Sequence, residues 1–148
     1  DSVIQGLRRL AECGWVVIHD GARPCISADL IERGLIASRE SGAAIAAVPV
    51  KDTIKIVSRH RFVQQTPIRQ SLWAAQTPQV FRYNLITEAY RQVNTEVSDD
   101  AALVEQLGHK VEVYMGSYQN IKVTTPEDLA IAEVFLRNNK KASFASGG

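Results

Sequence analysis

Cysteine, net charge and long apolar runs are all scarce in this 148-residue chain. Two cysteines, Cys13 and Cys25, are too few for a disulfide framework, and their spacing is not that of a metal site. We interpret both as reduced thiols in a cytosol-like compartment. A formal net charge of +1, without a basic stripe, disfavours a nucleic-acid partner. No apolar run approaches the roughly 18–20 residues of a membrane helix, so we expect no membrane partner.

The usual constellations for covalent catalysis are also missing. His19, His60 and His109 are scattered, and neither a Gly-x-Ser-x-Gly motif nor a metal-binding histidine spacing occurs. His19 is suggestive because it precedes Asp20, although a histidine in such a place is more often packed and hydrogen-bonded. The sequence therefore favours chemistry that depends on positioning and charge, such as phosphoryl-type transfer.

What the chain does contain is typical of one globular domain, with 45% hydrophobic and 22% charged residues. Residues 2–12 place apolar side chains at helical spacing. Residues 15–20 and 43–50 are apolar runs without alternation, as in parallel strands that are covered on both faces. Between them, residues 27–41 form a predicted helix that Gly42 ends. This order predicts an α/β fold with a mostly parallel sheet flanked by helices.

The middle of the chain interrupts this alternation. Residues 53–57 and 62–68 mix apolar and polar side chains around a polar Ser-Arg-His-Arg turn, which predicts a β-hairpin that leaves the domain body. A lone hairpin is marginally stable in water. We therefore expect this arm, at about residues 52–70, to pack on something, most simply on a second copy of itself.

The second half of the chain returns to the α/β pattern. It predicts a core segment at 72–82, helices at 83–94 and 98–108, strands at 110–116 and 120–124, and a helix at 125–139 with a capping box. The last residues, 140–148, are small, polar and glycine-rich, so we expect a disordered tail there. The sequence thus predicts one domain over residues 1–139.

Polar residues follow the first apolar run, where strands of a parallel sheet present their ligands. Asp20 can hold a hard cation such as Mg²⁺. Gly21 lets a ligand approach the backbone, and Arg23 offers a planar fork that suits phosphate. A turn closed by a salt bridge between Asp20 and Arg23 is the alternative interpretation.

Three further polar residues are candidates. Thr53 follows the second apolar run, where a solvated strand end is the simpler interpretation. Thr77 lies in an otherwise apolar segment and could cap a turn. Lys122 stands between two apolar residues of a predicted strand, which is unusual for a lysine. Either its side chain snorkels to an edge or its ammonium group faces a phosphate.

Five segments, in this order and at these gaps, resemble one known family: VVIHDGARPCI, VPVKDTIK, LWAAQTPQVF, SDDAALVEQLG and NIKVTTPEDLAIAE. Up to about residue 137 the chain is similar to the 2-C-methyl-D-erythritol 4-phosphate cytidylyltransferases of the non-mevalonate isoprenoid pathway. The resemblance implies a Rossmann-like nucleotidyltransferase fold and an enzyme that joins CTP to methylerythritol phosphate, releasing pyrophosphate. It also implies Mg²⁺ as cofactor, a homodimer formed through the arm, and a location in the cytoplasm, or in the plastid stroma of a plant.

The resemblance assigns roles to individual residues of this sequence. It implies that Arg69, reaching across from the partner subunit's arm, and Lys122 are catalytic and position the sugar phosphate. The implied binding residues are Asp20, Arg23, Thr53 and Thr77 for the substrate, Ser2 and Gly21 for the nucleotide, and Asp20 again for the metal.

One family feature is absent from this sequence: the glycine-rich loop, with a basic residue, that cradles the CTP triphosphate. Because that loop would precede Asp1, we expect this chain to be the C-terminal portion of the enzyme, inactive alone and with an exposed sheet edge. Three alternatives remain. The first is ribitol-5-phosphate cytidylyltransferase, the second is a related sugar-nucleotide transferase that uses another base, and the third is a non-catalytic dimerising fragment. The segments HDGARPC and RQSLWAAQTP favour the methylerythritol enzyme.

Overall fold

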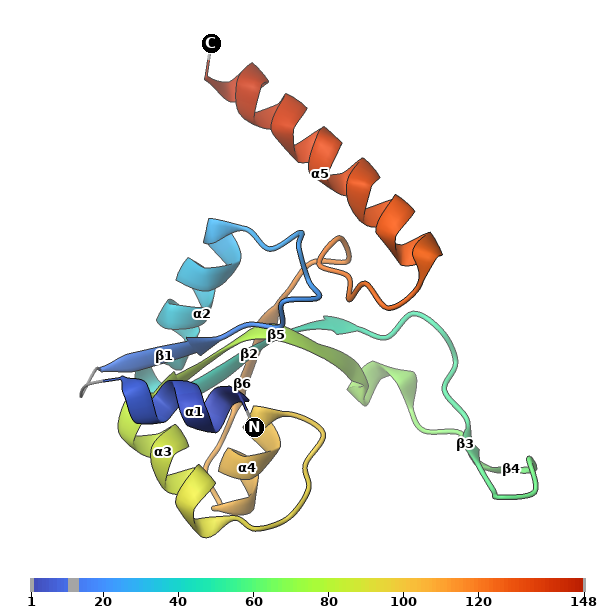
Figure 1. Cartoon of the computed structure of the whole chain (residues 1–148). Coiled ribbons are helices and arrows are strands. Elements are labelled where there is room, and N and C mark those ends of the chain that lie inside the picture. Colours follow the sequence, from blue (N-terminus) through green and yellow to red (C-terminus); the bar gives the residue numbers. More distant parts are fainter. Residues whose placement is uncertain (1, 11–13, 148) are drawn as a thin grey trace.

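The structure is a computed structural model that describes residues 2–10 and 14–147. Figure 1 shows a small α/β body from which a long helix and a thin arm project in different directions. The elements are, in chain order, α1 (Ser2–Arg9), β1 (Trp15–Ile18), α2 (Ala28–Ser41), β2 (Ala43–Pro49), β3 (Ile56–Val57), β4 (Val63–Gln65), a 3-10 turn (Arg69–Ser71), β5 (Trp73–Arg82), α3 (Tyr83–Gln92), α4 (Asp100–Gln106), β6 (Glu112–Met115) and α5 (Pro126–Ser146).

The central sheet has the strand order β1-β5-β2-β6. Strands β1, β2 and β6 run in one direction, and β5 lies between β1 and β2 in the opposite direction. The predicted α/β class with flanking helices is therefore confirmed. Although β1, β2 and β6 share one direction, β2 and β6 are the parallel strands that are hydrogen-bonded to each other. The chain returns from the arm directly beside β2 as its antiparallel neighbour β5, and β5 therefore separates β2 from β1.

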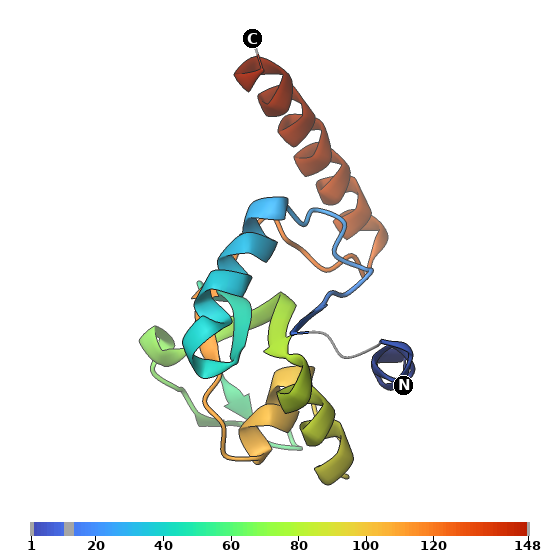
Figure 2. The ribbon, with the colours of Figure 1, turned by 90° about the vertical axis from the view of Figure 1, so that its left-hand side faces the viewer.

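The lack of alternation in β2 follows from burial on both faces of the sheet. Ala43 and Ile45 contribute to a core shared with α1, α3 and α4. Ala44 and Ala46 face the other way and pack with Leu30 of α2. Figure 2 shows α2 on one side of the sheet and α3 with α4 on the other, so each face has its own helical cover.

Capping residues mark several helix ends, among them the predicted Gly42 stop and the predicted capping box of α5. Ser27 accepts a hydrogen bond from the Leu30 N–H at the start of α2, and Gly42 ends that helix with a φ of +83°. Asp99 caps the start of α4, where its carboxylate accepts the Ala102 N–H at 3.0 Å. Thr125 and Asp128 form the capping box of α5.

Several predicted boundaries are wrong. Residues 120–124 form no strand, and the backbone there is held instead by the Val123 N–H, which donates to the Ala22 carbonyl at 2.8 Å. The segment 140–146 is helical rather than a disordered tail, since neither glycine nor proline interrupts α5 after Pro126. The first helix ends at Arg9, and the part of the prediction that concerns residues 11–13, Cys13 included, lies outside the described residues. No helix in the described part of the chain has the length and apolar character needed to cross a membrane.

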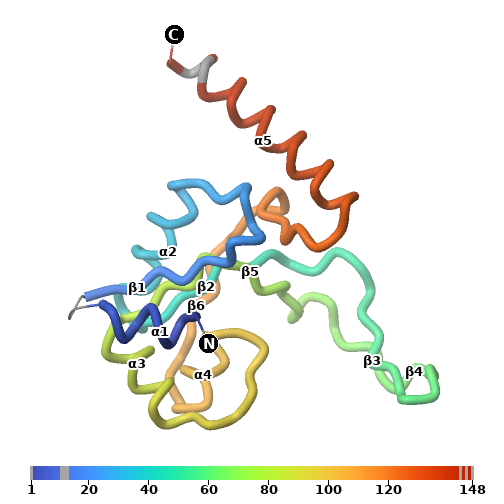
Figure 3. Tube along the Cα trace, in the orientation of Figure 1, coloured from blue at the N-terminus to red at the C-terminus, as the bar shows by residue number. Residues whose placement is uncertain are grey.

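The predicted hairpin is present as strands β3 and β4, which pair antiparallel with each other and with no other described strand. Figure 3 traces the chain as it leaves the sheet after β2 and returns at the start of β5. Apolar side chains of the arm are exposed, with Phe62 at 74% and Ile68 at 73% of their full accessibility. The arm therefore has no hydrophobic core of its own.

Candidate functional site

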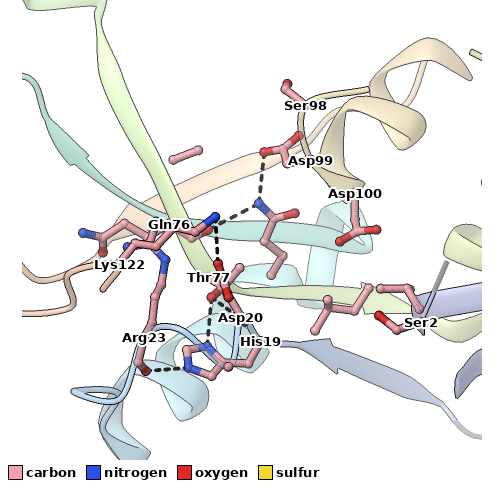
Figure 4. A pocket seen from close by; sticks show the side chains of 15 residues that line it. Ser2, His19, Asp20, Arg23, Gln76, Thr77, Ser98, Asp99, Asp100 and Lys122 are labelled. Carbon is pink, nitrogen blue, oxygen red and sulfur yellow. Dashed lines mark hydrogen bonds and ion pairs between the residues drawn. The ribbon is translucent and has the colours of Figure 1, made fainter. Parts of the chain in front are cut away.

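An open cleft of about 560 Å³ lies at the carboxyl end of β1. It is lined by the residues that follow β1, the middle of β5, the loop before α5, the start of α4 and the first two residues of α1. Figure 4 shows these side chains pointing toward one another from segments that are far apart in the sequence. The cleft is thus a product of the fold and not of one motif.

The turn after β1 is closed by its own backbone and by a carboxylate. Arg23 donates its N–H to the Asp20 carbonyl at 3.0 Å, and Asp20 Oδ1 accepts the Ala22 N–H at 2.9 Å. The other carboxylate oxygen, Oδ2, lies 3.2 Å from Lys122 Nζ. The Ala22 N–H, followed by Lys122, holds the pKa of Asp20 below its ordinary value of 3.8, although burial opposes this effect. Asp20 is therefore a charged, oriented carboxylate at neutral pH.

Arg23 does not form the salt bridge with Asp20 that was the alternative interpretation of this turn. Its Nη1 donates to the Asn120 carbonyl at 2.7 Å. Burial lowers the pKa of the Arg23 guanidinium, which still stays protonated at neutral pH. Its Nε is buried and has no hydrogen-bond partner among the described residues. Because Arg23 lines the cleft and bonds the described part of the chain through Nη1, its other Nη group keeps donor capacity for an anionic ligand.

Lys122 reaches the cleft from an irregular loop and not from the strand that was predicted. The hydrogen bond from Val123 to Ala22 holds this loop against the turn after β1. The Lys122 side chain is 53% exposed, and its ammonium group points to Asp20. Between the two interpretations of this lysine, the geometry agrees with an ammonium group that faces the site.

Thr77 comes from an irregular stretch of β5. Between the pairs Ile45–Gln79 and Ala47–Ala75, β2 has one intervening residue and β5 has three. Such a bulge re-aims side chains, and here Thr77 Oγ1 accepts the Asp20 N–H at 2.9 Å. Ser2 and Gly21 also line the cleft.

Two predicted site residues lie elsewhere in this chain. Arg69 belongs to the 3-10 turn at the root of the arm, where its Nη1 donates to the Lys51 carbonyl at 2.9 Å. Thr53 is exposed in the first half of the arm. Neither side chain lines the cleft.

Buried amide side chains behind the cleft escaped the sequence analysis. Asn120 is fully buried and donates from Nδ2 to the Thr77 carbonyl at 2.7 Å. Gln76 donates to the Ser117 carbonyl at 2.9 Å, and Gln79 donates to the Asp99 carboxylate at 3.0 Å. These bonds join β5 to the loop after β6 and to the start of α4. The sequence did contain one sign of this network: two glutamines stand in an otherwise apolar strand, and buried polar side chains need hydrogen-bond partners.

Three carboxylates line the cleft, and two of them, Asp99 and Asp100, already accept hydrogen bonds from Gln79 and Tyr90. Within residues 2–10 and 14–147, no three histidine, cysteine or acidic side chains gather as a metal-binding group. Mg²⁺ commonly binds through one or two carboxylates together with substrate phosphates. Asp20 therefore fits a Mg²⁺ ion that arrives with a phosphate ligand, with Lys122 as its competitor for Oδ2.

A carboxylate, a guanidinium and an ammonium group meet in a cleft at the carboxyl end of β1, the end at which α/β sheets bind their ligands. The fold and the cleft thus define an α/β protein with a polar, charged site. The family model described as IspD, 2-C-methyl-D-erythritol 4-phosphate cytidylyltransferase, matches residues 1–138. The chain belongs to this family.

Individual relatives agree with the family assignment. The protein named 2-C-methyl-D-erythritol 4-phosphate cytidylyltransferase from Alkaliphilus oremlandii (strain OhILAs) is 52% identical over 145 residues, which cover 95% of this chain and 61% of the relative. A crystal structure of 4-diphosphocytidyl-2C-methyl-D-erythritol synthase from Anaerococcus prevotii DSM 20548 superposes with a TM-score of 0.84 at 37% identity, covering 92% of this chain and 63% of the other. The corresponding cytidylyltransferase structure from Thermus thermophilus gives 0.82 at 37% identity, covering 92% and 68%. This chain thus spans about three fifths of the curated relative's length.

Proposed function

We propose that the protein to which this chain belongs transfers a cytidylyl group from CTP to 2-C-methyl-D-erythritol 4-phosphate and releases pyrophosphate. The observation that carries the proposal is the 3.2 Å contact between Lys122 and Asp20, with Arg23 on the same turn. It gathers two cationic groups and one carboxylate in a cleft of a family named for this reaction. Residues 2–147 supply the side of the site that holds the sugar phosphate.

In this reaction a phosphate oxygen of the sugar attacks the α-phosphorus of CTP. A new phosphorus–oxygen bond forms, and the bond to the β-phosphate oxygen breaks with pyrophosphate as leaving group. Catalysis of such a transfer depends mainly on alignment and charge stabilisation. Lys122 and Arg23 bind and orient the attacking phosphate, while Asp20, ionised at neutral pH, keeps the Lys122 ammonium aimed into the cleft.

We assign a Mg²⁺ ion to the Asp20 carboxylate when the nucleotide is bound. Mg²⁺ would neutralise charge on the nucleotide phosphates, and Asp20 would hold it from the protein side. An Asp20→Asn substitution is expected to weaken metal-dependent nucleotide binding in the longer protein, that is, the cytidylyltransferase to which we propose this chain belongs. The control is Asp29→Asn on α2, where the carboxylate pairs with Arg33 outside the cleft. Identical Mg²⁺ titration curves for the parent and Asp20→Asn would contradict the assignment.

The arm serves, in this proposal, to form a homodimer in which Arg69 completes the neighbouring cleft. Two observations support this role: Arg69 lies outside its own cleft, and Phe62 and Ile68 are largely exposed. Arg69→Ala should abolish transfer while the dimer persists. Transfer that survives in a monomer would favour the alternative of a mere dimerising fragment. We also propose a cytoplasmic location; among the residues that the structure describes, Cys25 is a buried free thiol.

The direct test is pyrophosphate release by the longer protein, with CTP and each candidate acceptor. We expect turnover with 2-C-methyl-D-erythritol 4-phosphate and far less with ribitol 5-phosphate. UTP in place of CTP tests the choice of base. Turnover with ribitol 5-phosphate alone would replace the proposed acceptor, and a lack of pyrophosphate release with every acceptor would overturn the proposal.

A further inference from the structure

His19 bridges two parts of the cleft wall that the proposed mechanism leaves unconnected. Its Nε2 lies 2.9 Å from the Arg23 carbonyl oxygen, across the turn that carries Asp20. Its Nδ1 lies 2.9 Å from Thr77 Oγ1 on β5. The same hydroxyl oxygen accepts the Asp20 N–H at 2.9 Å. Figure 4 shows the imidazole ring between these partners, with dashed lines on both sides.

The partners determine where the protons lie. A carbonyl oxygen only accepts, so Nε2 must carry the hydrogen that it donates to Arg23. In the neutral ring Nδ1 is then an acceptor, and the hydroxyl proton of Thr77 must point to it. Thr77 thus donates to His19 and accepts from Asp20 at the same time.

This arrangement of protons changes the role of Thr77. Phosphate oxygens only accept hydrogen bonds, so a ligand phosphate would need the hydroxyl proton that Thr77 has committed to His19. What Thr77 does provide is the acceptor that fixes the Asp20 backbone. At the other end of the turn, the His19 Nε2–H fixes the Arg23 carbonyl. Both charged residues of the turn are held by one pair of side chains.

We propose that His19, with its proton on Nε2, is a positioning residue: it directs the Thr77 hydroxyl onto the Asp20 backbone and clamps the turn that presents Asp20 and Arg23 to a phosphate ligand. Only the catalytic consequence of this inference rests on the proposed function. The hydrogen-bond arrangement itself belongs to the ligand-free chain and is tested there.

The first experiment measures the tautomer in the 148-residue chain labelled with ¹⁵N. Long-range proton–nitrogen spectra should give the neutral form of His19 a pyrrole-like Nε2 and a pyridine-like Nδ1. A His19→Asn variant assigns the signals among the three histidines. A pyrrole-like Nδ1 together with a pyridine-like Nε2 would overturn the proposal without any variant having to fold differently.

The second experiment follows exchange of the Asp20 amide hydrogen. Thr77→Val removes the acceptor and should speed exchange about tenfold, the value of one net hydrogen bond, while Thr77→Ser keeps it. His19→Phe should speed exchange about threefold by releasing the Thr77 hydroxyl. His19→Asn, whose amide oxygen can replace Nδ1 as acceptor, should restore the parent rate to within about twofold. Unchanged exchange in His19→Phe, or no rescue in His19→Asn, would overturn the proposal.

The catalytic consequence is measured in the longer protein. His19→Phe should lower kcat for pyrophosphate release about tenfold, because the misplaced turn no longer aligns the attacking phosphate. His109→Gln, at an exposed site outside the cleft, is the control and should leave kcat unchanged. If the tautomer and exchange results hold but the parent releases no pyrophosphate, the proposed function fails and the positioning role of His19 stands. An unchanged kcat in His19→Phe would overturn the catalytic consequence.

Discussion

The cleft wall and the arm are built in opposite ways. In the cleft, the turn around Asp20 is bonded to β5 and to the loop of Lys122, so segments from three parts of the chain fix one another. In the arm, β3 and β4 pair only with each other and expose their apolar side chains. The geometry of the cleft is thus set by contacts between distant segments of one chain, whereas the described part of the arm is held by its own strand pairing and, in our proposal, by a partner subunit.

The largest expected effect is at Lys122. Lys122→Ala should lower kcat/KM of the longer protein by about 10²–10³, the usual loss when one preorganised donor to a developing charge is removed. The free energy of unfolding should change by less than about 0.5 kcal/mol, because the side chain is 53% exposed. Lys110→Ala, an exposed lysine before β6, serves as control. Unaltered turnover would remove Lys122 from the site.

The next effect concerns the packing that supports the cleft. A Cβ atom at Gly34 of α2 would lie 2.6 Å from Tyr114 Oη and 2.9 Å from Val80 Cγ2. Gly34→Ala should therefore destabilise the fold by about 1–3 kcal/mol, as measured by urea unfolding. At Gly6 of α1, no atom of the described residues lies within 4 Å of such a Cβ, apart from its chain neighbours and the backbone of its own helix. Gly6→Ala should not destabilise the fold, and equal losses in the two variants would contradict this account of the packing.

In the arm we expect the reverse of the Gly34 result: a substitution there should affect assembly strongly and the stability of the fold little. Ile68→Ser should alter the free energy of unfolding by less than about 0.5 kcal/mol, because the side chain is 73% exposed. It should nevertheless shift the protein from dimer to monomer in sedimentation velocity. Ile36→Ser on α2 replaces an exposed isoleucine of the body and should leave the dimer intact. Dissociation in both variants, or in neither, would contradict a specific role for the arm.

The smallest effect is the pH dependence from Asp20. The pKa of this carboxyl is lowered in the folded chain, first by the Ala22 N–H and then by Lys122. Its contribution to stability is present above the ordinary value of 3.8 and is lost as pH falls through the lower folded-state pKa. Acid titrations of unfolding should show a shallower loss in Asp20→Asn than in the parent. An identical slope would mean that the carboxylate adds nothing to the folded state.

The burial of strands and the ends of helices were predictable from the sequence, whereas the direction of β5 and the pairing of the strands were not. The unalternated run of β2 predicts burial on both faces, and Ser27 and Gly42 mark the ends of α2. The apolar residues of β5 indicate burial equally well for either strand direction, so its reversal had no signal.

The same distinction applies to the site. Asp20, Arg23 and Lys122 stand out by residue type, and the structure gathers them in one cleft. The bonds made by His19 and Asn120 depend on which distant segments meet, and spacing along the chain does not reveal that. Arg69 lies outside the cleft of its own chain, so its assigned role needs a second subunit.

The arm leaves and rejoins the sheet through one pair of neighbouring residues. Val50 donates its N–H to the Leu72 carbonyl at 3.0 Å, directly beyond the paired ends of β2 and β5. Topologically, residues 51–71 are an enlarged loop of a single β-hairpin, which a two-residue turn would also close. The pairing of β2 with β5 is therefore closed without residues 51–71. The proposed chemistry still needs this segment, because Arg69 lies within it.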